Sequence, residues 1–444
     1  MRLSLSIALS LRFLGVGAGS SESNARRSLY GAMAGIGLSL VPLIVVLVVA
    51  NGMIEGISAR IIELSTSHMR VSDYAGISPI ADNPASLQRF AESLVANDGT
   101  GQITGAWAER NGTGIVIGPN GRSGGTVRAI QPEFIADPAV AGLFRAVAGD
   151  LSLAGPRDAL LGEKLAEETG LGVGDRFRLL TLSLRPDGTK IPRFTSWTVT
   201  GVVSSGYREL DALWVFLPYE TGFEAMSRES SSTFISVRTR DAFGNLDAVR
   251  YGLMRSAPEG FNVYSWDELN RGQFQTFNTT RTLLLFIMFL IVLVATVNVS
   301  SAVVMLVMER RRDTAILKST GTDTATISFA FVLAGFLTGL GGVLVGIPLG
   351  TLAALHVNGL FSAMERGLNL ANRLWYILFP SGLASPPEIR VLDPEYYLQV
   401  IPVTLSLRDL ALIACGTLLL SVLVSLVPAA KGAGEKPIET MRKF

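Results

Sequence analysis

The chain has 444 residues, of which 17% are charged and 48% are apolar, whereas about 25% of the residues in an average domain are charged. High apolar content excludes intrinsic disorder, and a single cysteine excludes an internal disulfide scaffold. The net charge of +1 gives no reason to expect a nucleic-acid partner. A mean hydropathy of +0.40 with so little charge predicts a globular portion joined to long uncharged stretches.

Four stretches of the chain carry no charge and are long enough to cross a membrane as helices. About 20 apolar residues span a hydrocarbon core of ~30 Å. The stretches are residues 31–50, 282–308, 324–355 and 410–430. We therefore predict an α-helical membrane protein with four transmembrane helices, called spans one to four.

Basic residues indicate the orientation of these spans. They are about twice as dense in residues 1–30, 309–323 and 431–444 as in residues 51–281 and 356–409, and basic segments stay in the cytoplasm. Both termini and the 309–323 loop are therefore expected in the cytoplasm. The 356–409 connection becomes an outer loop, and residues 51–281 become a large domain outside the cytoplasm.

The N-terminal segment, residues 1–30, contains a moderately apolar stretch that Arg12 interrupts. Such a stretch is too weak for a cleaved signal peptide. It favours a helix lying at the cytoplasmic face of the membrane, and a flexible tail is the alternative.

The large domain has near-normal charge and mixed helix and strand patterns, which predict an α+β fold. Strand-like runs occupy residues 114–117, 176–182, 197–203, 212–217 and 233–238, and helical patterns occupy residues 84–97 and 163–169. Apolar periodicity continues through residues 51–64 and resumes at residues 266–277. Spans one and two are therefore expected to extend outward as stalks.

Motifs for catalysis or metal binding are missing from the sequence. It contains no G-x-x-x-x-G-K-[ST] phosphate loop, no H-E-x-x-H and no C-x-x-C. Residues 121–125 match G-x-S-x-G, but they read as a turn with no helix after it, whereas a nucleophile elbow needs a strand-to-helix turn. We predict a non-catalytic chain with no metal site and no cofactor of its own.

Span three carries small residues at a spacing that allows helices to approach closely. These are Gly335, Gly339, Gly342 and Gly346. Asn298 is the most polar residue in the middle of span two, where it could bond across helices. The pattern predicts helix packing or dimerisation rather than chemistry.

The loop between spans two and three carries a resemblance to a known family. Residues 308–321 read M-E-R-R-R-D-T-A-I-L-K-S-T-G, and residues 294–298 read V-A-T-V-N. Together with motifs at 161–175 and 427–442, this order resembles the permease subunits of ABC transporters of the macrolide-exporter and cell-division-permease superfamily.

That resemblance implies partners for the chain. A separate cytoplasmic ABC ATPase, which would hold ATP and Mg²⁺, is expected to grip the loop, with a second permease, identical or homologous, completing the complex. The ATPase-coupling residues it implies are Glu309, Arg310, Asp313, Ile316, Leu317, Lys318 and Gly321. The charged ones would form polar contacts, and Ile316 and Leu317 would fill an apolar groove.

Within the superfamily, the sequence resembles the lipoprotein-releasing permeases. No nucleotide-binding domain is fused to it, the outward domain is large, and residues 393–403 resemble the outer loop of this subgroup. The resemblance implies extraction of lipoproteins from the outer leaflet of the bacterial inner membrane and transfer to a periplasmic carrier.

In one subunit type of this subgroup a hairpin docks the carrier, and residues 182–193 occupy its place. The candidate docking residues are Leu182, Arg185, Pro186, Asp187, Gly188, Pro192 and Arg193. A plain surface hairpin is an equally open interpretation.

Three other functions remain open. One is a mechanotransmitting permease that regulates cell-wall hydrolases. Another is an exporter of peptides or drugs that works with an adaptor protein. The third is a membrane receptor without transport activity.

Overall fold

The computed structural model describes residues 10, 24–73, 78–184, 189–378, 389 and 402–434. Outside these lie most of the N-terminal segment, residues 435–444 of the tail, the hairpin residues Arg185, Pro186, Asp187 and Gly188, and most of residues 379–401. The described chain forms two compact units. One, the helical bundle, contains described residues up to 52 and from 277 onward; the other, the large domain, contains residues 53–276.

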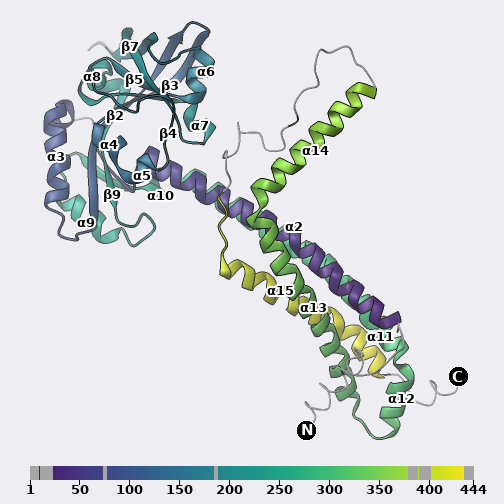
Figure 1. Ribbon diagram of the computed structural model, residues 1–444. Helices are drawn as coiled ribbons and strands as arrows, with labels where there is room; N and C mark the ends of the chain where they lie inside the picture. Colours follow the sequence, from purple (N-terminus) through teal and green to yellow (C-terminus); the bar gives the residue numbers. More distant parts are fainter. Residues whose placement is uncertain are drawn as a thin grey trace. The chain divides into compact units, whose positions relative to one another are not determined.

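Four helices have the length and composition to cross a membrane, which confirms the predicted number among the described residues (Figure 1). They are α2 (Asn24–Arg60), α11 (Arg271–Glu309), α13 (Thr324–Leu355) and α15 (Leu407–Gly434). A π-helix, η1 (Ile61–Thr66), continues α2. The membrane boundaries themselves stay predictions.

Two further helices belong to the bundle unit. The short helix α12 (Arg311–Ser319) lies between α11 and α13, and α14 (Val357–Leu378) follows α13 after His356. The predicted outer loop therefore contains a helix of 22 residues. The four long helices share one apolar core, to which each contributes buried side chains such as Ile36, Val299, Phe331 and Ala429.

The strands of the large domain form one mixed sheet. They are β1 (Met69–Asp73), β2 (Ile103–Gly118), β3 (Gly121–Ile130), β4 (Arg145–Gly149), β5 (Asp158–Gly162), β6 (Arg176–Leu184), β7 (Lys190–Ser204), β8 (Trp214–Pro218), β9 (Ser231–Thr239) and β10 (Phe261–Ser265). Their order is β10-β1-β9-β2-β3-β8-β5-β7-β4, and β6 pairs with both β2 and β7. Only the β3–β8 and β5–β7 pairings are parallel among the described strands.

The double pairing of β6 closes part of this sheet into a ring of six strands, β2-β3-β8-β5-β7-β6. Alternate side chains of these strands fill its interior, including Val116, Leu161, Leu179 and Trp197. Of the remaining strands, β4 pairs with β7, and β9, β1 and β10 extend from the other half of β2. Their core includes Leu87 of α3 (Pro84–Ala96) and Leu253 of α9 (Asp247–Ser256).

Short helices connect the strands. They are η2 (Pro79–Asp82), α4 (Pro132–Ala136), α5 (Pro138–Ala141), α6 (Glu163–Thr169), α7 (Arg208–Asp211), α8 (Tyr219–Ala225), η3 (Arg228–Ser230) and α10 (Trp266–Leu269). The α+β prediction is confirmed, and α6 has the predicted bounds. Asn83 caps α3 by accepting hydrogen bonds from the amides of Ala85 and Ser86.

Two local predictions were wrong. Residues 121–125 lie in strand β3 rather than in a turn, because they pair with residues 114–118 of β2. The expected helix over residues 266–277 is interrupted at Asn270, where the capped helix α10 ends and α11 begins.

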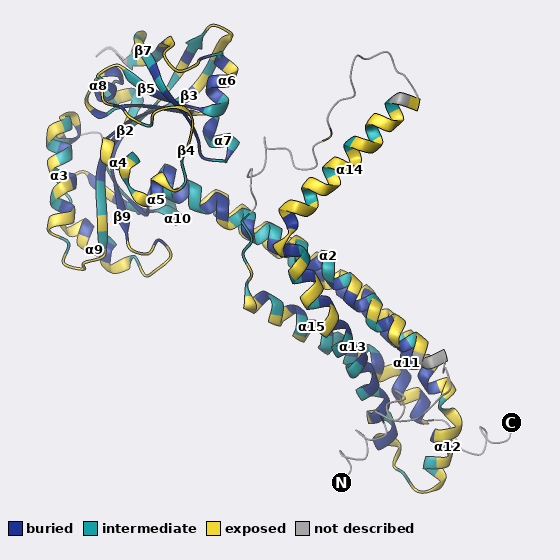
Figure 2. Cartoon of the chain, in the orientation of Figure 1, coloured by how far each residue is buried: buried dark blue, intermediate teal, exposed yellow. Residues whose placement is uncertain are grey.

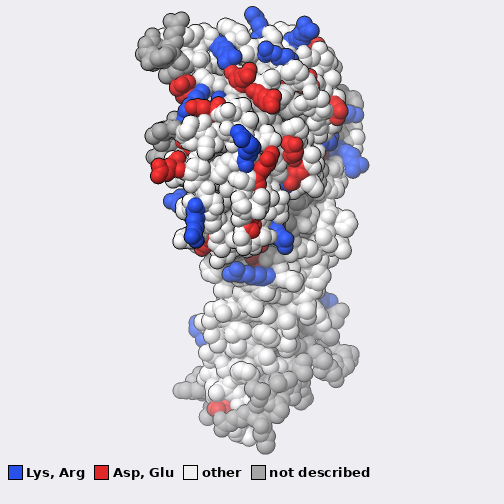
Figure 3. Space-filling view, turned by 90° about the vertical axis from the view of Figure 1, so that its left-hand side faces the viewer, with Lys and Arg blue, Asp and Glu red and all other residues white. Residues whose placement is uncertain are grey.

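Charge is distributed as the sequence suggested. On the face shown in Figure 3, the charged side chains gather over the large domain, and the surface of the long helices is almost free of them. Figure 2 shows many exposed residues along those helices, and several are large and apolar, such as Leu38, Val294 and Leu419. Exposed apolar surface of this extent is typical of contact with lipid or a partner.

Candidate functional sites

Helix α12 carries four of the predicted ATPase-coupling residues, which are Asp313, Ile316, Leu317 and Lys318. Thr314 and Ala315 are buried against the bundle, whereas 49% of Ile316 is exposed. Leu317 is half-buried and packs against the apolar core of the bundle. Of the two apolar residues expected to fill a groove, Ile316 therefore faces outward and Leu317 faces the bundle.

The charged residues of this loop lie around the start of α12. Arg310 precedes the helix, and its Nη1 atom lies 3.2 Å from Oδ2 of Asp313, one turn away. Glu309 ends α11 and is exposed, and Lys318 is half-buried in the last turn of α12. The predicted residues thus share one short helix and its two ends.

Gly321 ends α12 through its backbone conformation. Its φ is +91°, a left-handed value that favours glycine. The amide of Gly321 donates to the carbonyl of Lys318, and the amide of Thr322 donates to the carbonyl of Leu317, both at 3.0 Å. This is a Schellman motif, which satisfies the last carbonyls of the helix. Gly321 therefore fixes where α12 stops and α13 can begin.

The candidate docking residues belong to an antiparallel hairpin. β6 and β7 pair from Arg176 with Thr198 to Leu184 with Lys190, so Leu182 lies opposite Pro192. Arg193 Nη1 donates a hydrogen bond to the carbonyl of Glu224. The turn residues 185–188 lie outside the described residues.

One face of this hairpin is apolar and points away from the domain core. Phe177, Leu179 and Thr181 are buried, so the alternate positions Leu180 and Leu182 face outward with their opposite neighbours. Those neighbours are Phe194, which is 56% exposed, and Pro192. Sequence reasoning missed Leu180 and Phe194, and the signal that could have found them is the alternation of the two strands.

The glycines of span three lie at helix crossings within this chain. A Cβ atom on Gly335 would lie 2.6 Å from Ser425 Cβ, and one on Gly339 would lie 2.5 Å from Ser421 Oγ, both on α15. A Cβ on Gly342 would lie 2.7 Å from Ile36 Cβ of α2. A Cβ on Gly346 would lie 2.9 Å from the carbonyl oxygen of Gly37, also on α2. One helix thus packs closely against two neighbours.

Asn298 lies where α11 passes α2. Its Nδ2 atom would be 3.5 Å from a Cβ placed on Gly35, and its side chain is exposed within the single chain. An exposed amide halfway along a membrane helix needs a polar partner. Its role in packing stays a prediction.

Three polar residues tie the bundle helices together at one end. Asp409 of α15 is buried and lies 3.3 Å from Nη2 of Arg281 on α11. Asn51 of α2 donates a hydrogen bond of 2.8 Å to the same carboxylate. We call these three residues the Asp409 cluster. Each one directly flanks a charge-free stretch, so the cluster marks one end of three predicted spans.

Buried arginines of the large domain bind carbonyl groups of η1, the π-helix that continues α2. Arg128 Nη1 donates to the carbonyl of Leu64, and Arg70 Nη2 donates to the carbonyl of Ser65 at 3.1 Å. Arg128 also pairs with the buried Glu109 at 2.8 Å. We call Arg70, Arg128 and Arg238 the arginine collar. Cations at a helix C-terminus satisfy its free carbonyls and oppose its negative end.

Arg238 completes this collar through an acidic side chain of η1. It forms ion pairs with Glu63 and with Asp137. Glu63 also accepts a hydrogen bond from His68 Nε2 at 3.0 Å, because His68 Nδ1 accepts the amide of Thr239. The stalk end is therefore bonded to strands β1, β3 and β9 within the domain.

Burial and charge shift the pKa values in this region. Burial is the main cause that lowers the pKa of Arg70 to about 10, in part offset by Glu109. For Glu63, burial acts to raise the pKa, but hydrogen bonds and charges from His68 and Arg238 outweigh it and leave the pKa below its usual value. Both groups therefore remain charged at neutral pH.

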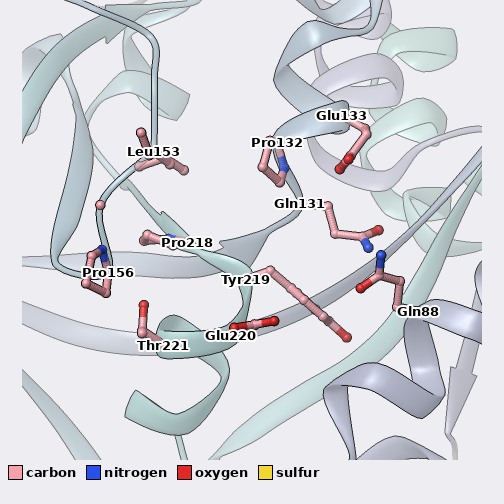
Figure 4. Close-up of a pocket in the computed structure, with 12 residues that line it drawn as sticks. Gln88, Gln131, Pro132, Glu133, Leu153, Pro156, Pro218, Tyr219, Glu220 and Thr221 are labelled. Atoms are coloured by element: carbon pink, nitrogen blue, oxygen red, sulfur yellow. The ribbon is translucent and has the colours of Figure 1, made fainter.

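An open pocket of about 330 Å³ lies in the large domain (Figure 4). Its polar groups serve the fold: Gln131 accepts the amide of Ala108, and the hydroxyl of Tyr219 donates to the carbonyl of Pro84. Glu133 and Glu220 are exposed acids at its edge. Across the described part of the chain, moreover, no group of three or more His, Cys, Asp or Glu side chains could hold a metal ion.

Two family models match successive parts of the chain. One, described as the MacB-like periplasmic core domain, matches residues 31–250. The other, described as the FtsX-like permease C-terminal domain, matches residues 285–437. The chain belongs to the ABC-transporter permease superfamily that these two domains define, as its loop motif predicted.

Within that superfamily, the chain is similar to the lipoprotein-releasing permeases. It is 26% identical over 425 residues to the lipoprotein-releasing system transmembrane protein LolC of Neisseria meningitidis, with 93% of each chain covered. LolC of Haemophilus influenzae is 24% identical over 421 residues, covering 93% of this chain and 92% of that protein. LolE of the same organism is 25% identical over 289 residues, 64% of each chain.

This membership has direct consequences for the class of protein. Permease subunits of ABC transporters are non-catalytic membrane proteins, and the family with its four apolar helices indicates the bacterial inner membrane. The relatives are named for a lipoprotein-releasing system.

Proposed function

We propose that this chain is one of two permease subunits of an ATP-driven complex that extracts lipoproteins from the outer leaflet of the inner membrane. The observation that carries the proposal is the similarity to LolC along 93% of both chains. Both termini and α12 face the cytoplasm in this proposal, and the large domain faces the periplasm. The second permease is identical or homologous.

Depletion of the protein in its native cell tests the transport function. Lipoproteins destined for the outer membrane should then accumulate in the inner membrane fraction. Normal lipoprotein sorting with a cell-division defect would instead support the cell-wall regulator, and normal sorting with sensitivity to drugs or peptides would support the exporter. Either result would overturn the proposal.

Helix α12 is the element through which a separate ATPase acts in this proposal. Its buried side is fixed to the bundle by Thr314 and Ala315, and Ile316 projects from its exposed side. Movement of a protein bound there would reach α11 and α13 directly, since α12 follows one and precedes the other. Glu309, Arg310, Asp313 and Lys318 provide the charged contacts.

A pair of substitutions tests this coupling role. Ile316→Glu places a charge on the exposed contact residue and should reduce co-purification of the ATPase and substrate-stimulated ATP hydrolysis by about tenfold, the effect of ~1.4 kcal/mol. Arg312→Ala changes an exposed residue of the same helix that the family motif does not assign. Equal effects of the two variants would contradict a specific role for Ile316.

The β6–β7 hairpin is the site at which the periplasmic carrier docks in this proposal. Its exposed face provides apolar surface on the two paired strands, from Leu180, Leu182, Pro192 and Phe194. Exposed apolar side chains grouped in this way favour a protein partner.

The combined variant Leu182→Ser and Phe194→Ser tests carrier docking. It should abolish crosslinking of a periplasmic carrier to the hairpin while ATP hydrolysis by the complex continues. Tyr251→Ser, at an exposed aromatic residue of α9, is the matched control. Undiminished crosslinking by the double variant would leave the plain surface hairpin as the correct interpretation.

A further inference from the structure

Helix α14 has one apolar and one polar side. Taken at 100° per residue, its apolar positions gather on one face: Leu360, Phe361, Met364, Leu368, Trp375 and Leu378. We call these six residues the apolar face of α14. Trp375 is 63% exposed and Leu378 is 70% exposed, and the exposed residues of the helix are visible in Figure 2.

The opposite side of α14 is where the chain contacts itself. Asn369 lies on this polar side with Ser362, Glu365 and Arg366. Its Nδ2 atom donates to the carbonyl of Ile389 at 3.0 Å, and the amide of Ile389 donates to its Oδ1 atom at 2.7 Å. Ile389, a described residue of the returning chain, therefore binds the polar side of α14.

The position of α14 along the chain places it at a membrane boundary. It begins one residue after α13, a candidate membrane span, and residue 407 begins the next span, α15. Two candidate spans, α11 and α13, lie between the large domain and α14 along the chain. Two crossings return it to the same side, so α14 lies on the side of the membrane that holds the large domain.

The composition of α14 distinguishes a helix that lies on a membrane from one that spans it. It contains Glu365, Arg366 and Arg373 within 22 residues and is not among the four candidate spans. Trp375, on the apolar face, is a residue type that prefers the membrane–water interface. An amphipathic helix of this kind rests in the interface with its apolar side among acyl chains.

We propose that α14 lies in the membrane interface on the side of the large domain, with its apolar face in the lipid. Glu365, Arg366 and Arg373 face the headgroups and water, and Ile389 binds the polar side. This interaction with a lipid surface is independent of the transported substrate. It gives the permease a contact with the leaflet that is separate from its four spans.

Spin-label accessibility in the full-length protein tests this proposal. Cys415 is the single cysteine of the chain, so Cys415→Ala provides a background for single cysteines at Leu368 and Trp375 on the apolar face and at Ser362 and Arg366 on the polar side. The labelled protein is placed in nanodiscs of phosphatidylethanolamine and phosphatidylglycerol. Leu419, exposed on α15, and Tyr251, exposed on α9, provide lipid and water references.

Labels on the apolar face should be accessible to oxygen and protected from a water-soluble nickel chelate, as at position 419. Labels on the polar side should follow position 251. Access of the chelate to the apolar face would overturn the proposal, and protection from both reagents would assign that face to a protein neighbour, including a second copy of the chain.

Native tryptophan fluorescence provides a second readout without a label. Brominated acyl chains quench a tryptophan that lies among them. The emission of Trp375 is the difference between the native protein and the Trp375→Phe variant. This difference should be strongly quenched in nanodiscs of brominated lipid. Unquenched Trp375 emission in the folded protein would overturn the proposal even if the cysteine variants fail to fold.

Discussion

In the helical bundle, α13 approaches its neighbours so closely that a single added methyl group on Gly342 would collide with Ile36. In the large domain, the positions under the greatest constraint are buried charges, such as Arg128 and Glu109. The difference follows from the solvent. Lipid is as apolar as leucine, so membrane helices gain stability mainly from close contact, whereas a water-exposed domain buries enough apolar area to tolerate paired charges in its core.

The largest expected effect lies in the domain. Arg128→Met removes the ion-pair partner of Glu109 and the donor to Leu64, so it should lower the free energy of unfolding by about 3–5 kcal/mol. Denaturant unfolding of the full-length protein in detergent measures this change. Arg122→Met, on the exposed end of β3, should change it by less than about 0.5 kcal/mol. If the double variant Arg128→Met and Glu109→Gln is no more stable than Arg128→Met alone, the broken ion pair is not the cause of the lost stability.

The bundle should respond most strongly to added volume. Gly342→Ala forces α13 and α2 apart and should cost about 1–3 kcal/mol, measured as a lower thermal unfolding temperature in detergent. Gly416→Ala on α15 is the matched control, because open space surrounds that position. Similar losses for both variants would mean that close packing of α13 is not what stabilises the bundle.

The collar around η1 predicts a dependence on acid. The folded-state pKa of Glu63 is lowered from its ordinary value of 4.5. Ionised Glu63 therefore stabilises the fold fully above pH 4.5, and this stabilisation is lost as the pH falls through the lower folded-state pKa. Glu63→Gln should cost about 1–2 kcal/mol at neutral pH, and this difference from the native protein should shrink below about pH 4.

A comparison of variants isolates this effect from other acids of the domain. The pKa of Asp211 is raised by burial. Ionisation of Asp211 therefore lowers the stability of the fold as the pH rises, opposite to the effect of Glu63. Thermal unfolding of Glu63→Gln is therefore compared with that of the native protein at each pH, with Glu259→Gln as the exposed control. A difference that does not change with pH would exclude an ionised Glu63.

The smallest expected effect concerns the end of α12. Gly321→Ala should cost about 1 kcal/mol because alanine resists the left-handed conformation, and amide hydrogen exchange in residues 311–321 should become faster. Gly321→Asn keeps most of that conformational freedom and should behave nearly like the native protein. Equal exchange in both variants would show that the backbone angle at this position is not limiting.

The sequence was sufficient where a pattern is local and repeated. Uncharged length predicted the four membrane helices, and period-two and period-3.6 patterns found five of the strands and the bounds of α6. The short edge strand β4 was missed because all of its residues are exposed and carry no alternation. Strand β1 was missed because it has only five residues.

The candidate sites, like the fold, could be predicted only where a local pattern in the sequence marks them. The loop motif placed the coupling residues on one helix end, but only the structure separates Ile316 from Leu317 by burial. The arginine collar joins residues more than a hundred positions apart, such as Glu63 and Arg238. The Asp409 cluster left a usable signal, since each member flanks an uncharged stretch, whereas their mutual contact depends on how the helices pack.

The pairing of β1 determines when the large domain can fold. β1, at residues 69–73, lies between β9 and β10, and Met69 is opposite both Val237 and Ser265. Nearly the whole insertion between α2 and α11 must therefore be available before its first strand acquires either neighbour. Contacts of such long sequence separation make folding slow. In the proposed orientation, the domain completes its sheet only after residue 265 has crossed the membrane, so until then the emerging chain should be sensitive to periplasmic proteases.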